Sequence, residues 1–297
     1  MAIPSDSDGE ATRRLQGIAL ICGAVLMFTL LDTAAKYLTA FLPALEIAWI
    51  RFVGHAVFAF LVLRPWRKPS LYRTQRPVAQ IIRSTFLFSS TVFNFLAIRT
   101  LQLDQTASIM FAAVFVMAAL SGPLLGEWVG PRRWVAVVVG FIGVLVVIRP
   151  GTEAFEPAML YSIAAMLSVS GYMLITRHLA ATDSAEGMIL FSALVPSVLL
   201  APIALPTAEW PQSATVAIVL VCTGIIGGIG HWMLIHAHRL APTPVLSPFL
   251  YTQLLWMTLA GYVFFDQLPD RSTLFGAALI IGSALYILYR ERVRGSA

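Results

Sequence analysis

The sequence predicts an all-α membrane protein, with ten transmembrane helices in two inverted five-helix repeats and both termini in the cytoplasm. Three observations lead to this prediction. Ten apolar stretches follow one another from Leu15 to Leu288 with short polar segments between them. The positively charged residues sort to alternate sides of these stretches, and the second half of the chain repeats features of the first. Function is therefore expected in or across a bilayer.

The composition excludes a soluble domain. Hydrophobic residues make up 58% of the chain, charged residues 12%, and the mean hydropathy is +0.81, whereas about a quarter of a soluble domain is charged. The net charge is +5, but the cations are spread over loops and helix ends, so lipid headgroups rather than nucleic acid are the expected partners. Cys22 and Cys222 both lie in apolar stretches, so no disulfide framework is expected.

Each apolar stretch can cross a bilayer, because roughly 20 helical residues span the hydrocarbon. The expected spans are 15–38, 44–63, 78–98, 106–125, 134–149, 158–176, 187–205, 214–236, 243–264 and 272–289. They divide the chain into a cytoplasmic tail (1–14), a first repeat (15–150), a second repeat (151–290) and a second cytoplasmic tail (291–297).

The loop charges orient the spans. With the N-terminus inside, only Arg99, Arg149 and Arg271 fall outside. The inside set is Arg13, Arg14, Arg64, Arg67, Lys68, Arg73, Arg76, Arg132, Arg133, Arg177, Arg239, Arg290, Arg292 and Arg294. Positive loops resist translocation, so this asymmetry predicts two cytoplasmic termini.

The fourth and fifth spans correspond to the ninth and tenth at an offset of 139 residues. This offset aligns Leu101 with Leu240, Ser108 with Ser247, Glu127 with Asp266, Arg132 with Arg271 and Gly143 with Gly282. A repeat unit of five spans enters the membrane from opposite sides in its two copies. Inverted repeats of this kind build transporters that open alternately to either face.

The segment GPLLGEWVGPRRWVAVVVGFIGVLVVIRPG (122–151), with its echo FFDQLPDRSTLFGAALIIGSALYILY (264–289), resembles the EamA-like branch of the drug/metabolite transporter superfamily. The shared features are a Gly-Glu at the end of the fourth span and a Gly-rich fifth span, both repeated later. In the second copy, Phe265 and Asp266 replace the Gly-Glu. Asp32, Lys36, Glu46 and Arg51, with the segment 267–273, are most similar to the branch with S-adenosylmethionine uptake carriers, which also holds amino-acid exporters and proposed riboflavin carriers.

Ionisable residues inside the first two spans are the sharpest local signal, because each is costly in hydrocarbon. In an antiparallel hairpin turning at Phe41, Lys36 would share a depth with Glu46, and Asp32 with Arg51. Two ion pairs would then cross the hairpin. These pairs either neutralise charge and lock the hairpin, or expose Asp32 or Arg51 to a charged substrate group or a coupling proton. Lys36 and Glu46 are the predicted gating pair.

Polar residues in later spans complete the candidate binding site. Asn94 follows Ser90 and Thr91 in the third span, and Ser247 and Tyr251 lie four residues apart in the ninth, where Pro244 and Pro248 can kink the helix. Helix–helix hydrogen bonding is the alternative explanation for these residues. A midplane cavity between the halves is expected, lined by Asp32, Asn94, His231 and Tyr251.

The histidines of the eighth span allow two interpretations. His231, His236 and His238 resemble a metal-binding pattern, but His236 and His238 lie at the cytoplasmic end beside Arg239, so neither a metal nor a cofactor is predicted. His231 follows a glycine-rich run and is either a buried structural histidine or a cavity residue. Its neighbour Trp232 is a candidate for stacking on a planar substrate.

The sequence thus predicts a secondary transporter of a bacterial inner membrane that carries a small polar metabolite. Amino acids or their derivatives, including S-adenosylmethionine, are the expected substrates, and riboflavin or another planar cofactor or drug is the alternative. An ATP-binding Gly-x4-Gly-Lys-Ser/Thr loop is missing from the sequence. A membrane enzyme or receptor is the alternative of another class. Proton coupling and a homodimer are further expectations.

Overall fold

The all-α class is confirmed by the computed structural model, which describes residues 6–125, 130–180 and 182–295. Within these ranges every regular element is helical. The elements are α1 (Asp6–Leu38), α2 (Ala44–Leu63), η1 (Pro69–Tyr72), α3 (Pro77–Ile98), α4 (Leu103–Phe111), α5 (Ala113–Leu125), α6 (Pro131–Ile148), α7 (Met159–Leu179), α8 (Ala185–Ala204), η2 (Leu205–Thr207), α9 (Ala214–Leu240), α10 (Thr243–Leu250), α11 (Thr252–Phe265) and α12 (Arg271–Gly295).

Eight helical stretches in the described ranges are long and apolar enough to cross a membrane. A shorter apolar stretch, Trp134–Ile148, lies within α6. The expected ninth span is divided between α10 and α11, of 8 and 14 residues. Helices α1 and α12 continue beyond their apolar stretches, so hydropathy alone did not locate their outer ends.

The fourth and ninth spans are broken at equivalent positions. Ala112 separates α4 from α5, with φ −66° and ψ −11°, and Tyr251 separates α10 from α11, with φ −70° and ψ −12°. These residues are 139 positions apart, which is the offset of the sequence repeat. Pro248 precedes only the second break, so proline does not account for the feature that both halves share.

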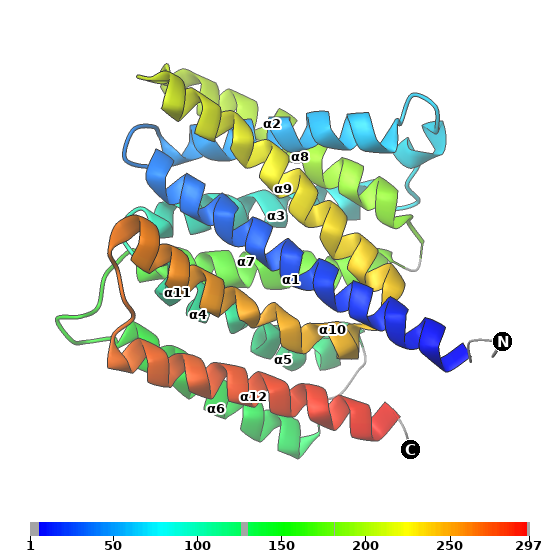
Figure 1. Ribbon diagram of the computed structural model, residues 1–297, viewed down its shortest axis with the longest axis vertical. Coiled ribbons are helices and arrows are strands. Elements are labelled where there is room, and N and C mark those ends of the chain that lie inside the picture. The colour runs from blue at the N-terminus through cyan, green and yellow to red at the C-terminus, as the bar shows by residue number, and fades with distance from the viewer. Residues whose placement is uncertain (1–5, 126–129, 181, 296–297) are drawn as a thin grey trace.

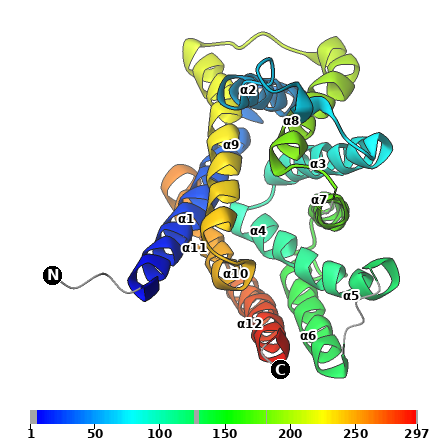
Figure 2. The ribbon, with the colours of Figure 1, turned by 90° about the vertical axis from the view of Figure 1, so that its right-hand side faces the viewer.

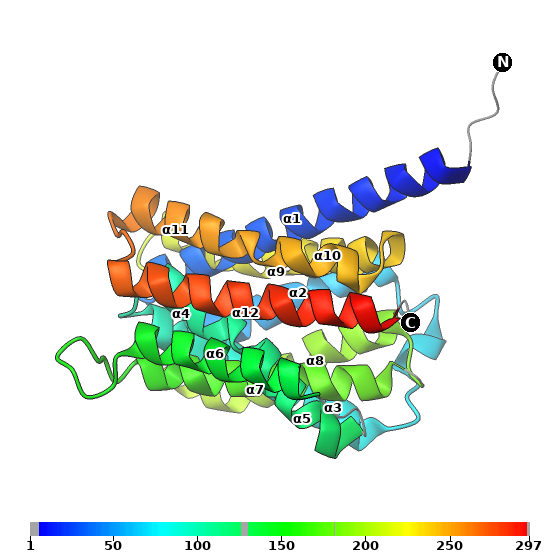
Figure 3. The same cartoon turned by 90° about the horizontal axis from the view of Figure 1, so that it is seen from below.

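The helices form two layers that meet at both ends of the molecule (Figures 1 and 2). One layer contains α1, α9, α10 and α11, and the other contains α3, α7, α4 and α5. Helices α2 and α8 join the layers at one end, and α6 and α12 join them at the other. Figure 3 shows the start of α1 and the end of α12 on the same side of the molecule.

The expected hairpin of α1 and α2 is wrong. The two helices are joined by a short turn but then diverge, and α9 packs against both of them. A short connection fixes only the nearest ends of two helices, whereas α9 offers each a small-residue surface. A Cβ built on Gly224 of α9 would lie 2.5 Å from the Cα of Gly54 in α2, so these backbones are in direct contact.

Candidate functional site in a polar cluster between the two layers

Asp32 of α1 reaches across to the opposite layer, where the side chain of Asn94 in α3 donates a hydrogen bond to its carboxylate at 3.1 Å. The two residues are 62 positions apart and both are half-buried. A carboxylate is costly in an apolar interior unless it is hydrogen-bonded, and Asn94 provides this bond. The structure therefore brings together two of the four predicted cavity residues.

Arg51 of α2 is 5% exposed and lies on the same part of α3. Its Nη1 is 3.4 Å from the hydroxyl of Thr91, which precedes Asn94 by almost one turn, and a Cβ on Gly227 of α9 would lie 3.7 Å from its Nε. Nε itself has no hydrogen-bond partner among the described residues. A buried guanidinium with an unused donor is suited to bind an anionic group.

The predicted ion pair between Asp32 and Arg51 is not formed among the described residues. Asp32 is hydrogen-bonded to Asn94, and Arg51 approaches Thr91. The two charged side chains therefore form their hydrogen bonds with α3, nearly one turn apart, and not with each other. This follows from the divergence of α1 and α2, which the hairpin argument did not include.

His231 of α9 stacks on His55, which follows Arg51 by one turn of α2. The ring centroids are 5.0 Å apart with an interplanar angle of 4°, and Phe28 of α1 contacts His231 edge-on at 5.1 Å. His55 is 2% exposed, and its Nδ1 has no hydrogen-bond partner among the described residues. His231 therefore belongs to a polar cluster, which we define as Asp32, Arg51, His55, Asn94 and His231.

The predicted pair of Lys36 and Glu46 is wrong. The ammonium of Lys36 donates to the carbonyl oxygens of Ile98 and Leu101 at 2.9 and 2.6 Å, where α3 ends. Glu46 accepts a hydrogen bond from the backbone N–H of Glu209 at 2.9 Å. Backbone N–H and C=O groups at helix ends lack a partner within the helix, so they readily form hydrogen bonds with side chains. Such groups bind Lys36 and Glu46, which therefore do not need to pair with each other.

The other three predicted residues lie in different surroundings. Trp232 is 40% exposed and contacts the ring of His236, with centroids 4.1 Å apart. Ser247 is half-buried in α10. Tyr251, at the break between α10 and α11, packs edge-on against Phe111 beside the other break, with centroids 5.1 Å apart. Glu127, the acidic residue of the family-like segment, lies outside the described residues.

Sequence reasoning missed Arg83, which is 1% exposed in α3. Its Nε donates to Gln80 at 3.1 Å, and its Nη2 donates to the hydroxyl of Ser192 at 2.9 Å and to the carbonyl of Met188. Its Cζ lies 5.2 Å from the ring centroid of Tyr172. An arginine inside the third expected span was the sequence signal that could have identified it. The hydrogen bonds to Met188 and Ser192 connect α3 to α8, and the ring contact connects it to α7.

Asp183 extends this network into the loop before α8. Thr74 and Gln80 donate hydrogen bonds to its Oδ2 at 2.6 and 2.5 Å. Burial opposes ionisation, but these bonds outweigh it and hold the pKa of Asp183 below its ordinary value. The loops before α3 and before α8 are thereby joined at one end of the bundle.

Comparison with known families decides the class of the protein. The model of the EamA-like transporter family matches residues 15–149 and again residues 156–289. The chain belongs to the EamA-like transporter family. Together with its apolar helices, this membership makes it a multi-pass transporter of the inner membrane.

Curated relatives of this EamA-like chain carry transporter names. It is 28% identical to the S-adenosylmethionine uptake transporter of Rickettsia prowazekii, over 94% of each chain. It is 27% identical to the riboflavin transporter of Vibrio cholerae, over 93% of this chain and 94% of that one. A crystal structure with 18% sequence identity superposes with a TM-score of 0.64, over 92% of this chain and 98% of the other, and supports the fold alone.

Proposed function

We propose that this EamA-like transporter carries S-adenosylmethionine or a related amino-acid-derived metabolite by alternating access. The observation that carries the proposal is the polar cluster, in which the half-buried carboxyl group of Asp32 and the buried guanidinium of Arg51 both lie between the layers. A zwitterionic amino-acid group offers one charge to each. The relatives named S-adenosylmethionine uptake transporters support this choice of substrate.

In this proposal Arg51 binds the substrate carboxylate through its unused Nε donor, and Asp32 binds the substrate ammonium. Asn94 orients the carboxylate of Asp32. His231 and His55 contribute an aromatic surface next to Arg51. Ser247 and Tyr251 stay predicted substrate contacts, and Tyr251 also contributes to gating because it lies at a helix break. Trp232 is 40% exposed and packs on His236, so it is left out of this proposed site.

Alternating access requires two equivalent halves, and we propose ten spans in two inverted repeats with both termini cytoplasmic. The matching breaks at Ala112 and Tyr251 support the repeat, as do the two separate matches to the family model. Mirrored packing supports it too, because α1 packs on α9 as α7 packs on α3. Phe111 and Tyr251 bring the two breaks into contact, where a pseudo-two-fold axis would pass.

A planar cofactor such as riboflavin is the second candidate substrate. The relative named a riboflavin transporter and the stacked rings of His55 and His231 favour it. Proton coupling and a homodimer stay predictions. A non-transporting enzyme or receptor is the alternative of another class, and it predicts no accumulation of any substrate in vesicles.

Uptake into liposomes tests the proposal. Purified full-length protein should accumulate labelled S-adenosylmethionine above the level of protein-free liposomes, and excess unlabelled compound should block the signal. Uptake of riboflavin alone would favour the second candidate. Failure to accumulate either compound, by protein that is folded and monodisperse, would overturn both substrate assignments.

Asn94→Ala should reduce this uptake about tenfold or more, because losing a hydrogen bond to a charged group costs about 1.5–3 kcal/mol. Thr85→Ala is the matched control on the same helix, because the Thr85 hydroxyl bonds only the carbonyl of Ile81 among the described residues. Tyr251→Ala is expected to abolish transport, whereas Ser272→Ala at the start of α12 should have little effect. Normal transport by both the Asn94 and Tyr251 variants would place the binding site elsewhere.

A further inference from the structure

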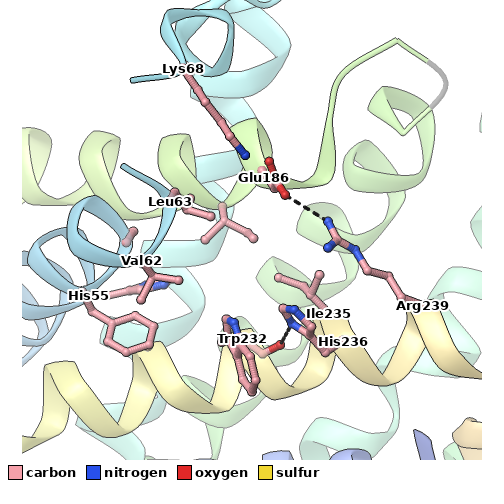
Figure 4. A pocket seen from close by; sticks show the side chains of 13 residues that line it. His55, Val62, Leu63, Lys68, Glu186, Trp232, Ile235, His236 and Arg239 are labelled. Carbon is pink, nitrogen blue, oxygen red and sulfur yellow. Dashed lines mark hydrogen bonds and ion pairs between the residues drawn. The ribbon is translucent and has the colours of Figure 1, made fainter. Parts of the chain in front are cut away.

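A pocket of about 210 Å³ lies between α2, α8 and α9, near the loop that connects α2 to α3. Figure 4 shows its lining. Val62 and Leu63 come from α2, and Trp232 and Ile235 from α9, so the walls are largely apolar. Charged side chains gather at one end. The pocket is therefore amphipathic, with a polar end and an apolar body.

The pocket lies along the exposed apolar face of α9. Ile218, Val221 and Ile225 are exposed apolar residues of this helix, at 63%, 58% and 45%. Trp232 lies seven residues after Ile225, two helical turns along the same face, and Arg239 seven residues further. Val62 on the facing helix is also exposed, at 44%. An occupant would therefore enter from the bilayer.

Lys68, Glu186 and Arg239 form the polar end. Arg239 is 3.3 Å from Glu186 in an ion pair, and Lys68 points toward the same carboxylate in Figure 4. The ammonium of Lys68 has no hydrogen bond or ion pair within the described parts of the chain. Two cations and one anion leave this end with a net positive charge, which complements an anionic headgroup.

We propose that this pocket binds the phosphate group of an anionic phospholipid, with Lys68 and Arg239 at the phosphate and Val62 and Trp232 beside the first part of an acyl chain. The cations lie at one end of the pocket, and the apolar walls extend from that end. A phospholipid has the same order, with a charged headgroup followed by acyl chains. The inner wall includes His55, so the lipid would lie next to the polar cluster.

Quenching of tryptophan fluorescence by brominated lipids tests this proposal in the full-length protein. The protein is reconstituted into phosphatidylcholine vesicles that contain a minor fraction of a brominated lipid, with the bromine near the headgroup end of the acyl chain. The brominated lipid is phosphatidylglycerol in one sample and phosphatidylcholine in the other. Brominated phosphatidylglycerol should quench the tryptophan fluorescence more strongly than brominated phosphatidylcholine does. This excess should be missing in Trp232→Phe, because Trp232 is the tryptophan that contacts the bound chain.

Lys68→Gln should lower the preference for phosphatidylglycerol about fivefold, since each cation near a lipid surface contributes about 1 kcal/mol. Arg73→Gln is the matched control, because Arg73 is exposed on the same loop and does not line the pocket. Equal quenching by both lipids, or an unchanged preference in Lys68→Gln, would overturn the proposal. Loss of the excess on adding inorganic phosphate would assign the site to a free anion instead of a lipid.

Discussion

Two buried arginines illustrate how different surroundings give similar residues different roles. Arg83 donates to Gln80, Met188 and Ser192 and lies against the ring of Tyr172. Arg51 has one long hydrogen bond to Thr91 and an Nε without a partner among the described residues. Each nitrogen of the Arg83 guanidinium donates a hydrogen bond, so Arg83 has little left to offer a ligand, whereas Arg51 has an unused Nε donor.

Arg83→Gln is therefore expected to destabilise the protein by about 1–3 kcal/mol, because buried acceptors on α8 lose their donor. Thermal unfolding in detergent measures this effect. Arg99→Gln removes an exposed arginine at the other end of the same helix and should leave the unfolding temperature nearly unchanged. An Arg83 variant as stable as the Arg99 variant would show that the network does not hold α3 to α8.

At the scale of the element, small residues decide which helices pack together. Helices α2 and α9 touch at Gly54 and Gly224, and α6 and α12 approach each other at Gly143 and Gly276, where an added Cβ would lie within 3 Å of a backbone oxygen. In a membrane, close backbone approach supplies much of the association between helices, because lipid tails are as apolar as the side chains. Glycine positions therefore fix the pairing of α9 with α2.

Gly224→Ala should destabilise the protein by about 1–3 kcal/mol, because the new Cβ meets the backbone of Gly54, which cannot move aside as a side chain can. Gly282→Ala is the matched control. No atom lies within 4 Å of its built Cβ, so it gains the helix propensity of alanine without a clash. If both variants unfold at the same temperature, the contact of α2 with α9 contributes nothing measurable.

Asp270 joins α6 to α12 at the end of the bundle opposite to Asp183. It accepts the backbone N–H of Thr273 at 2.7 Å, which caps α12, and it pairs with Arg149 just after α6. Burial acts to raise the pKa of Asp270, but the hydrogen bonds from Thr273 and Arg149 outweigh it, so its pKa lies below the ordinary value of 3.8.

A lowered pKa in the folded state means that ionised Asp270 stabilises the protein above the unfolded pKa. This contribution is lost as the pH falls through the folded pKa. Asp270→Asn keeps a capping side chain but loses the charge. The gap in unfolding temperature between wild type and variant should be present near neutral pH and should shrink below about pH 4. A gap that stays constant into acid would show that the pair with Arg149 adds no stability.

At the scale of the whole molecule, the proposed inverted repeat would relate the two layers. It would match helices α1, α9, α10 and α11 in one layer with α7, α3, α4 and α5 in the other, and the pairs α2 with α8 and α6 with α12 join the layers. The polar cluster takes Asp32, Asn94 and His231 from both layers. Relative movement of the layers would therefore change the distances within the cluster, as alternating access requires.

Reporter fusions test the inverted topology. A reporter after Ala297 should be cytoplasmic, and one after Pro150, between α6 and α7, should lie on the other side, because a repeat of five spans reverses the side of its end. The two fusions should give opposite signals with alkaline phosphatase and with a fluorescent protein that matures only in the cytoplasm. Identical signals from both positions would contradict the five-plus-five arrangement.

The sequence by itself determined the all-α class and the approximate positions of the eight described stretches that are long and apolar enough to cross a membrane, and it selected Asp32 and Asn94 as candidates. These features depend on local hydropathy and on the cost of single polar groups in lipid, which can be evaluated along the chain. The breaks at Ala112 and Tyr251 lie at the same 139-residue offset, although the sequence alone did not predict a break at Ala112.

Only the tertiary structure decided which groups the charged side chains contact. Sequence reasoning paired Asp32 with Arg51 and Lys36 with Glu46, because it treated consecutive helices as neighbours. In the structure α9 packs against both α1 and α2, and side chains bond to α3, to helix ends and to a distant loop. Helix packing depends on how small residues such as Gly54 and Gly224 allow two backbones to approach. That complementarity is a property of two surfaces far apart in the sequence, so no local pattern could reveal it.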